Sequence, residues 1–572
     1  MFRTTLRSTL LAGTLLAAGW AQAHDDSAHD APKPTELKQF GKVPHAPGIV
    51  AGDAAVPLWQ NLGSHSYPVT TAASRAQLYF DQGLMLAYGF NHWEALRAFR
   101  AAQAIDPACA MCFWGEALVL GPNINAPMAP AALAPAVAAL RKAQALAAGA
   151  SEKEQALIAA LATRYSEDPE AERSGLDIAY ADAMRDVSGR FPDDLDVAAL
   201  HAEALMDLSP WDYWTDGGKT PKGRTADLVT TLERVLANNP DHPGAIHLYI
   251  HAVEASSRPQ RAEPYADRLA ALKLGAGHLV HMPSHIYYRL GRYADSLAAN
   301  KAAVAADEAY LAQVKAEGIY PGGYYPHNIH FLLVSAQMAG DGETAIAAAE
   351  KLEATVSDEA VKAFPGFQPV KVAPLFAHAQ FSDPETVLAL AEPNADLPYV
   401  KAMWHYARGT AFAAKGDAAA AQAEADAIEA IGREADFSDL TGASVPAPDI
   451  LKLARHIILG RIARAGGHLD GAIREFEAAH AIEKSLAYME PPFWYYPVQQ
   501  SLGAVLLMAG ETDRAEAVFQ ASLQAATNNG WACFGLAEVH KRRGETAEAA
   551  ELEERLARTW AGNRAMLDLN RM

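Results

Sequence analysis

Seven histidines lie close together in the middle of the sequence, and histidine is the side chain best suited to bind a transition metal. They fall between residues 247 and 330, although the whole chain of 572 residues has only 20 histidines. Neutral imidazole binds zinc, copper, nickel and iron, and it also carries protons near neutral pH. We therefore predict a binding site here. For any single histidine, a hydrogen bond to the backbone or to a nearby carboxylate is the alternative interpretation.

The spacing of these histidines suggests which ones act together. His247 and His251 are four residues apart and Glu254 follows by three, so all three lie on one face of a helix. The stretch from Gly277 to His285 contains three histidines, and Pro283 suits the first turn of a helix. These three are His278, His281 and His285. His327 and His330 again stand near a helix start, directly after a proline.

The elements that position them are predicted to be helices throughout. From about residue 72 onward the sequence reads as amphipathic helix, and no alternating strand pattern competes. Small and aromatic residues recur in units of about 34 residues. The first unit contains Tyr79, Gly83, Ala95, Phe99, Ala102 and Pro107. Later units contain Gly409, Gly416 and Ala421; Gly460, Gly467, Ala472, Phe476 and Ala479; Gly503, Gly510, Ala515 and Phe519; and Leu536, Gly544 and Ala549.

This pattern resembles the tetratricopeptide repeat family. The resemblance implies an all-α, right-handed superhelical solenoid of antiparallel helix pairs. Within it we expect N-terminal repeats over 72–190, central histidine-rich repeats over 191–356 and C-terminal repeats over 357–572. In the centre we expect first helices at 194–208, 243–256, 278–290 and 325–339, with second helices near 224–238, 260–273, 293–307 and 342–356.

In this family the first helices line the concave face, so the resemblance brings the central histidines to one surface. We predict a transition-metal site, for copper, zinc or iron, formed by His247, His251, Glu254, His281 and His285. Four more histidines are predicted to line the same cavity, namely His201, His278, His327 and His330. The zinc-protease motif His-Glu-x-x-His is absent from the histidine pair on the helix, so peptide hydrolysis of that kind is not supported.

Aromatic residues flank the histidines in two long loops. Trp211 and Trp214 lie in one loop, and Tyr324 and Tyr325 lie in the other. Two interpretations stay open. Such residues plug the ends of a solenoid, or they wall a pocket and exclude water from it.

Three cysteines are too few for a disulfide scaffold. Cys109 and Cys112 form a Cys-x-x-Cys pair, which we expect to be a disulfide in an oxidising compartment. A redox or metal role is the alternative, but two thiolates alone make an incomplete zinc site.

The first 23 residues resemble an export signal, because Arg3 and Arg7 precede an apolar stretch and a small-residue cleavage site. We therefore expect a periplasmic or secreted protein, with a flexible leader over 24–71 and no membrane span. The net charge is −20, or −22 once Arg3 and Arg7 are removed. Such an acidic chain is expected to avoid nucleic acid.

Three functions fit these observations. The first is an exported protein whose histidine-lined cavity binds a transition metal or a small polar ligand. The second is a scaffold of the cell envelope that binds a peptide or a protein, the usual role of the family. The third is a metal-dependent envelope enzyme acting on a small substrate, with Glu254 or Glu203 as base. We rank binding above catalysis, because no complete catalytic constellation can be identified from spacing.

Overall fold

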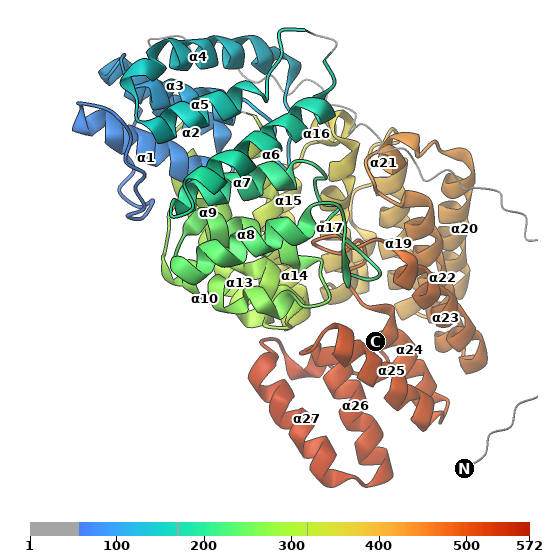
Figure 1. Ribbon diagram of the computed structural model, residues 1–572. Coiled ribbons are helices and arrows are strands. Elements are labelled where there is room, and N and C mark those ends of the chain that lie inside the picture. The colour runs from blue at the N-terminus through green and yellow to red at the C-terminus, as the bar shows by residue number, and fades with distance from the viewer. Residues whose placement is uncertain (1–55, 169–170, 317) are drawn as a thin grey trace, which may run out of the picture. The chain divides into compact units, whose positions relative to one another are not determined.

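The structure, a computed structural model, describes residues 56–168, 171–316 and 318–572. The predicted signal and most of the predicted leader, residues 1–55, lie outside the described residues. The rest is almost entirely helical, with successive antiparallel helices packed side by side (Figure 1). The predicted all-α fold of helical hairpins is confirmed. No helix in the described ranges is long and apolar enough to cross a membrane.

The N-terminal hairpins begin after the described end of the leader. Their helices are α1 (Ser74–Tyr88), α2 (His92–Ile105), α3 (Ala110–Val119), η1 (Pro130–Ala132), α4 (Leu133–Leu146), η2 (Ala147–Gly149), α5 (Glu152–Ala162) and α6 (Arg173–Arg190).

The central hairpins follow the predicted order, and each predicted helix is present within a few residues of its expected bounds. They consist of α7 (Leu195–Met206), α8 (Thr225–Asn238), α9 (Pro243–Glu254), η3 (Pro259–Ala262), α10 (Glu263–Ala271), α11 (Gly277–His281), α12 (Pro283–Arg289), α13 (Tyr293–Leu311), η4 (Tyr320–Tyr324), α14 (Tyr325–Ala339) and α15 (Gly342–Thr355). The loop between α7 and α8 contains two short antiparallel strands, β1 (Trp214–Thr215) and β2 (Thr220–Pro221).

The C-terminal hairpins complete the chain. Their helices are α16 (Asp358–Ala363), η5 (Pro365–Phe367), α17 (Gln368–Phe381), α18 (Pro384–Leu388), α19 (Pro398–Ala414), α20 (Ala418–Glu434), α21 (Ser438–Gly442), α22 (Ala447–Ala465), α23 (Leu469–Ser485), α24 (Val498–Met508), α25 (Thr512–Ala525), α26 (Gly530–Arg543), α27 (Thr546–Thr559) and η6 (Arg564–Met566).

Glycine and phenylalanine at the repeat positions explain how the two helices of a hairpin approach so closely. A Cβ at Gly503 would lie 2.5 Å from Phe519, and one at Gly83 would lie 2.7 Å from Phe99. Both phenylalanine side chains are fully buried. Any larger side chain at these glycines would push the second helix away, which is why the repeats keep a small residue there.

The described end of the leader, residues 56–71, differs from the flexible segment that we predicted. It has no helix or strand, yet it packs against the N-terminal hairpins. Leu62 and Tyr67 are buried, the backbone N–H of Tyr67 donates to Asp81 (3.0 Å), and Thr70 donates to Glu154. These buried contacts hold the segment in place.

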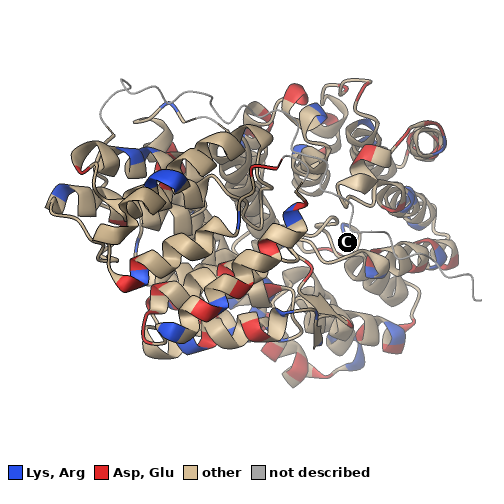
Figure 2. Ribbon diagram, turned by 45° about the horizontal axis from the view of Figure 1, so that its top comes forward, with Lys and Arg blue, Asp and Glu red and all other residues tan. Residues whose placement is uncertain are grey.

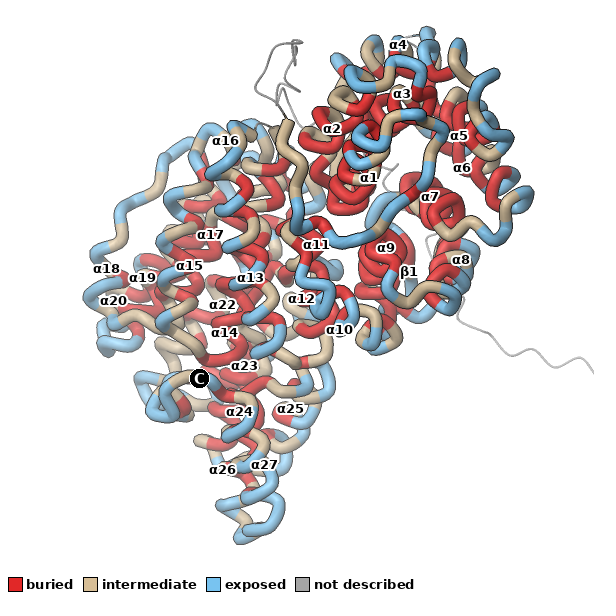
Figure 3. The backbone as a smooth tube through the Cα atoms, turned by 90° about the vertical axis from the view of Figure 1, so that its left-hand side faces the viewer, coloured by how far each residue is buried: buried red, intermediate tan, exposed pale blue. Residues whose placement is uncertain are grey.

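Charge and burial are distributed as expected for a helical array. Acidic and basic residues are interspersed over the described helices (Figure 2). Buried residues instead concentrate on the inner helices, and α9 is buried along its whole length (Figure 3). The histidines of the centre therefore lie in the interior rather than on a solvent-exposed face.

Candidate metal centre

Helix α9 presents the first pair of histidines in the protein interior. The helix begins after His242, whose Nδ1 accepts a hydrogen bond from the backbone N–H of Ala245, and Pro243 fits the first turn. His247 and His251 lie one turn apart on the same face. Because all twelve residues of α9 are buried, both rings face other helices.

Helices α11 and α12 form the next first helix and are separated only by Met282, after which Pro283 begins α12. Its start is fixed by a close approach, because a Cβ at Gly277 would lie 1.9 Å from Asp307 Oδ1. Tyr320 donates to the same carboxylate (2.7 Å), which ties η4 to this point. The three histidines on this helix are His278, His281 and His285, all buried.

The first histidine group consists of His247, His251 and His278. Each residue offers one ligand nitrogen, and the three nitrogens lie within 4.8 Å of one another. The Nε2 atoms of His247 and His278 are 3.2 Å apart. Three nitrogens bound tetrahedrally to one ion at 2.0–2.1 Å would be about 3.3 Å apart, so small ring rotations would complete such a site. Phe90 packs against the group, 4.4 Å from His247 between ring centroids.

The second histidine group consists of His281, His285 and His327, and its ligand nitrogens also lie within 4.8 Å of one another. The Nε2 atoms of His281 and His285 are 2.8 Å apart. His327, from the start of α14, lies 4.8 Å from His281 between ring centroids. Phe331 packs against this group as Phe90 does against the first, with its ring 4.5 Å from His285.

The two groups are neighbours. The ring of His251 is 5.5 Å from that of His285, and the ring of His278 is 5.8 Å from that of His281. Each group therefore touches the other through two of its three rings. Whatever binds in one group lies close to whatever binds in the other.

Hydrogen bonds fix the proton positions in the second group. His281 Nδ1 lies 2.7 Å from Asn300 Oδ1, and the amide nitrogen of Asn300 donates to the Ser296 carbonyl, which fixes its orientation. His285 Nδ1 lies 2.6 Å from a carboxylate oxygen of Glu254. The Asn300 contact requires a proton on Nδ1, because an amide oxygen only accepts, and the Glu254 contact requires one as long as the carboxylate is ionised. Both Nε2 atoms then carry a lone pair.

The same logic applies to the first group. His247 Nδ1 donates to the backbone carbonyl of Tyr88 (2.6 Å), and His251 Nδ1 donates to the other oxygen of Glu254 (2.8 Å). Their Nε2 atoms are therefore unprotonated, and His251 Nε2 has no hydrogen-bond partner among the described residues. For His278 it is Nδ1 that lacks a described partner. The Nε2 lone pairs of His247 and His251 are donors that a cation can use, and His278 approaches His247 through its Nε2 atom.

Burial keeps these rings neutral. It lowers the pKa of His247, His251 and His285 to about 3, and it lowers the pKa of His278 and His281 well below the usual value. Neutral imidazole is the form that binds metals. Burial also raises the pKa of the Glu254 carboxyl, while the His251 contact opposes that effect.

The structure divides the five predicted metal ligands differently from the single site that we expected. The four histidines fall into the two groups, and His278 and His327 complete them. Glu254 does not point at the Nε2 atoms; it contacts the Nδ1 atoms behind them. Asn300 and the Tyr88 carbonyl were missed, because they come from elements distant in sequence and carry no spacing signal.

Of the remaining predicted residues, two contact the groups directly. Trp211 lies 5.0 Å from His251 between ring centroids, and Tyr324 lies 4.6 Å from His278. The indole N–H of Trp211 donates to Asn125 (3.0 Å). Trp211 is 43% exposed and has a positive φ of 65°, so a strained loop residue lies between His251 and solvent.

The others lie outside both groups. Trp214 donates to the Ala252 carbonyl of α9 (2.7 Å), which anchors the β1–β2 loop. Tyr325 donates to Glu308 (3.0 Å). His330 Nε2 contacts the Tyr495 hydroxyl (2.8 Å), and His201 is buried on α7.

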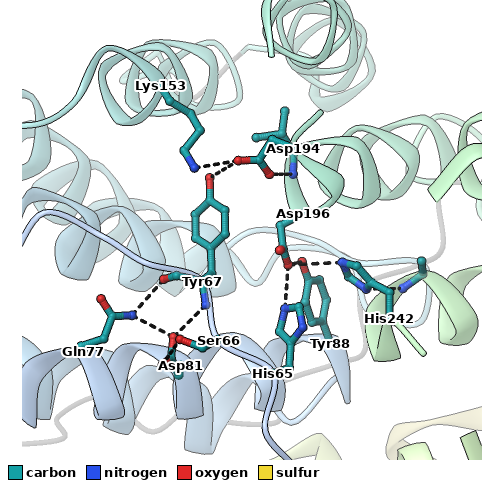
Figure 4. Close-up of polar contacts among 12 residues, drawn as sticks. His65, Ser66, Tyr67, Gln77, Asp81, Tyr88, Lys153, Asp194, Asp196 and His242 are labelled. Carbon is teal, nitrogen blue, oxygen red and sulfur yellow. Dashed lines mark hydrogen bonds and ion pairs between the residues drawn. The ribbon is translucent and has the colours of Figure 1, made fainter. Parts of the chain in front are cut away.

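A third group of possible ligands, His65, Asp196 and His242, has the character of a hydrogen-bonded clamp (Figure 4). Asp196 lies 2.8 Å from His65 Nε2 and 3.3 Å from His242 Nε2, and it accepts from the Tyr88 hydroxyl (2.7 Å). Because His242 Nδ1 already accepts a backbone N–H, its Nε2 carries the proton. The N–H and O–H groups of this third group all face the Asp196 carboxylate. Its imidazole lone pairs therefore do not face one common point, as metal ligands would. We call these four residues the Asp196 cluster.

The remaining predicted pair, Cys109 and Cys112, forms a disulfide at the start of α3. Cys533 is a buried free thiol.

Comparisons with known proteins extend the fold assignment. Residues 506–564 match the tetratricopeptide repeat family. No curated protein matches the chain. Human IFIT1, solved as a dimer with PPP-AAAA, is 14% identical over 84% of this chain and 90% of that chain, with a TM-score of 0.31.

Two further solved structures are similar at the same level. Yeast Tom70 is 12% identical over 87% of this chain and 94% of that chain, with a TM-score of 0.27. The APC/C hetero-tetramer Cut9-Hcn1 contains a chain that is 14% identical over 88% of this chain and 96% of that chain, with a TM-score of 0.25. The described chain is built from antiparallel helical hairpins, and residues 506–564 match the tetratricopeptide repeat family.

Proposed function

We propose that the protein binds two transition-metal ions, one in each histidine group. Each group offers three imidazole nitrogens within 4.8 Å of one another. Three histidines are a common ligand set for zinc and copper in proteins. Hydrogen bonds to the far side of the ring orient ligand histidines in known metal sites, and His247, His251, His281 and His285 all have such bonds.

One observation carries the proposal. The Nε2 atoms of His281 and His285 are 2.8 Å apart, while their Nδ1 protons are committed to Asn300 and Glu254. Two lone pairs at this distance repel each other in a buried site unless a cation or a proton lies between them. A metal ion satisfies both without disturbing either outer hydrogen bond. A proton would create a buried imidazolium, which burial disfavours.

The donor set favours copper, with zinc and iron as alternatives. Imidazole suits copper, zinc, iron and nickel, and neither group contains a thiolate. All six donors are neutral, and Glu254 is the one carboxylate among the described residues that hydrogen-bonds to the groups. The cost of burying an ion grows with its charge, which favours singly charged copper over a divalent ion.

Metal analysis of protein purified without a histidine tag tests the proposal. We expect about two ions per chain, and about one ion after either His251→Ala or His285→Ala. A tetrahedral zinc site is worth about 10–16 kcal/mol, so one ligand of four accounts for roughly 3–4 kcal/mol, or about a 100- to 1000-fold loss of affinity.

Two histidines outside the groups serve as controls. His330 is buried next to the second group but bonds to Tyr495, and His468 is exposed between α22 and α23. Replacing either with alanine should leave the metal content unchanged. Wild-type protein without stoichiometric metal, even after incubation with Cu⁺ or Zn²⁺, would exclude the proposal.

A second candidate function is binding of an envelope protein or peptide, supported by the family match over residues 506–564. Binding of a peptide or a protein is the usual role of the family that these repeats resemble. The two functions are compatible, because the match lies in α24–α27 and the histidine groups lie in α9–α14. A pull-down from envelope extract with residues 498–572 deleted would separate them: loss of a partner with unchanged metal content supports a second, independent binding region. An exported location rests on the sequence alone.

A further inference from the structure

Glu254 lies between the two histidine groups and contacts one ring of each. One carboxylate oxygen is 2.8 Å from His251 Nδ1, and the other is 2.6 Å from His285 Nδ1. The side chain is fully buried at the end of α9. His251 belongs to the first group and His285 to the second. No other described side chain bonds to a histidine of each group.

We propose that Glu254 is a shared positioning residue, which holds the proton on Nδ1 of one ligand in each group and so keeps both Nε2 atoms free to bind a metal. This inference rests on the proposed function. Its physical basis is that an ionised carboxylate only accepts hydrogen bonds. A ring whose Nδ1 faces such an oxygen must carry its proton there, and its Nε2 lone pair is then available.

The arrangement makes the two sites depend on a single side chain. The other supports are separate, because the Tyr88 carbonyl holds His247 and Asn300 holds His281. Glu254 alone fixes a ligand in both groups. The choice of a carboxylate follows directly, since it offers two acceptor oxygens and no donor.

Glutamine at position 254 should make the two histidine groups unequal. It has nearly the same shape, but one end is an acceptor oxygen and the other is an NH₂ donor. The amide oxygen can still accept from one histidine. The NH₂ group faces the other Nδ1 and donates to it, which moves that ring's proton to Nε2 and removes its lone pair from the metal site.

The experiment is a Zn²⁺ titration of the metal-free full-length protein in competition with a chromophoric chelator. We expect wild-type protein to bind two ions. Glu254→Gln should bind one ion with nearly wild-type affinity and the other at least about 10- to 100-fold more weakly, the usual effect of losing an outer hydrogen bond to a ligand. Glu254→Asp keeps two acceptor oxygens on a shorter side chain, so it should weaken both sites to a similar extent.

Glu94→Gln is the matched control. Glu94 is also a buried carboxylate, and it bonds to Arg97 and Tyr310 rather than to a histidine. The Glu94→Gln protein should bind two ions, as wild-type protein does. If Glu254→Gln fails to fold, unequal affinities in Glu254→Asp would overturn the inference, and equal weakening would support it.

The outcomes separate the inference from the function on which it rests. Wild-type protein that binds neither Zn²⁺ nor Cu⁺ contradicts the metal-binding function itself. Two ions in wild-type protein together with two unchanged affinities in Glu254→Gln, or with two equally weakened ones, overturns the role of Glu254 and leaves metal binding intact.

Discussion

Replacing Asp196 with alanine should destabilise the region around α7 and α9 by several kcal/mol. The carboxylate is buried, accepts hydrogen bonds from His65 and the Tyr88 hydroxyl, and lies 3.3 Å from His242 Nε2. Alanine would leave the His65 and Tyr88 donors without an acceptor and would also remove the anion beside the His242 ring. Each unsatisfied buried donor costs about 1–3 kcal/mol. Because neighbouring effects are not additive, we expect a total loss of about 3–6 kcal/mol.

The same substitution should weaken metal binding in the first group but not in the second. Tyr88 links the Asp196 cluster to the site, because its hydroxyl bonds to Asp196 while its carbonyl accepts from His247 Nδ1. Loss of the cluster frees the C-terminal end of α1 to shift, and with it the Tyr88 carbonyl that orients His247. The second group is held by Asn300 and Glu254 instead. We expect about a tenfold loss of affinity for one ion of the two.

The destabilisation should depend on pH in a defined direction. Burial disfavours charge on His65, yet the Asp196 contact and the nearby Asp81 outweigh it and raise the pKa of His65 above its usual value. This charged contact therefore stabilises the fold fully below about pH 6.5, and its contribution is lost as pH rises through the higher folded pKa.

Asp196 sets the lower limit of the pH range in which the cluster stabilises the fold. Burial alone would raise the pKa of Asp196. The contacts with His242 and His65 outweigh burial and hold this pKa well below its usual value. This contribution is present above about pH 3.9 and is lost as pH falls through the lower folded pKa. The difference between wild-type and Asp196→Ala protein should therefore be largest between about pH 4 and 6.5.

Native-state hydrogen exchange of α7 and α9, measured at about pH 5.5 and 8.5, gives the local free energy of opening. Asp196→Asn keeps one acceptor oxygen and loses the charge, so it should cost less and show little dependence on pH. A loss in Asp196→Ala that is below about 1 kcal/mol, or one that is larger at the higher pH, would refute this account of the cluster.

Two further predictions concern the scaffold. Phe519 is fully buried against Gly503 and Gly535, so Phe519→Ala should cost about 3–5 kcal/mol and expose α24–α27 to protease, while the metal content stays unchanged; loss of metal would contradict the separation of the two regions. Cys109 and Cys112 form a disulfide and Cys533 is free, so thiol counting under denaturing conditions should find one thiol per chain, and three would contradict the disulfide.

The fold could be predicted from the sequence because its signals are local. A glycine on a first helix and a phenylalanine on the second recur at a fixed spacing, and both sides of that contact lie within one hairpin, as Gly83 and Phe99 show. The bounds of the central helices could be predicted for the same reason. The packed leader was not predicted, because Tyr67 and Thr70 bond to Asp81 and Glu154, which belong to other elements and carry no periodic pattern.

The candidate site could be predicted in composition but not in arrangement. Helical spacing identified His247 with His251 and placed Glu254 on the same face. It could not show that Glu254 faces Nδ1, because that depends on how α12 packs beside α9. Nor could spacing find Asn300, which reaches His281 from the second helix of the hairpin.

The three histidine-bearing first helices share one register, and that register explains why there are two groups. Each group combines two positions four residues apart on one helix with a position near the start of the next first helix. On each of these helices we number the ligand positions from the one nearest the helix start. The second position follows the first by three residues, and the third follows it by seven. The residues there are Gly244, His247 and His251 on α9; His278, His281 and His285 on α11–α12; and His327, His330 and Val334 on α14.

The helices before and after these two groups lack one or more of the three histidines, and the structure explains why. On α14 the last position is Val334, so His330 has no partner histidine and bonds to Tyr495 instead. On α9 the first position is Gly244, where a Cβ would lie 2.5 Å from Tyr88, and His201 on α7 stands without the other two ligands. A histidine at residue 244 would displace the residue whose carbonyl orients His247. The repeat therefore supplies the geometry of a three-histidine group at every step, and the side chains complete it at two neighbouring steps.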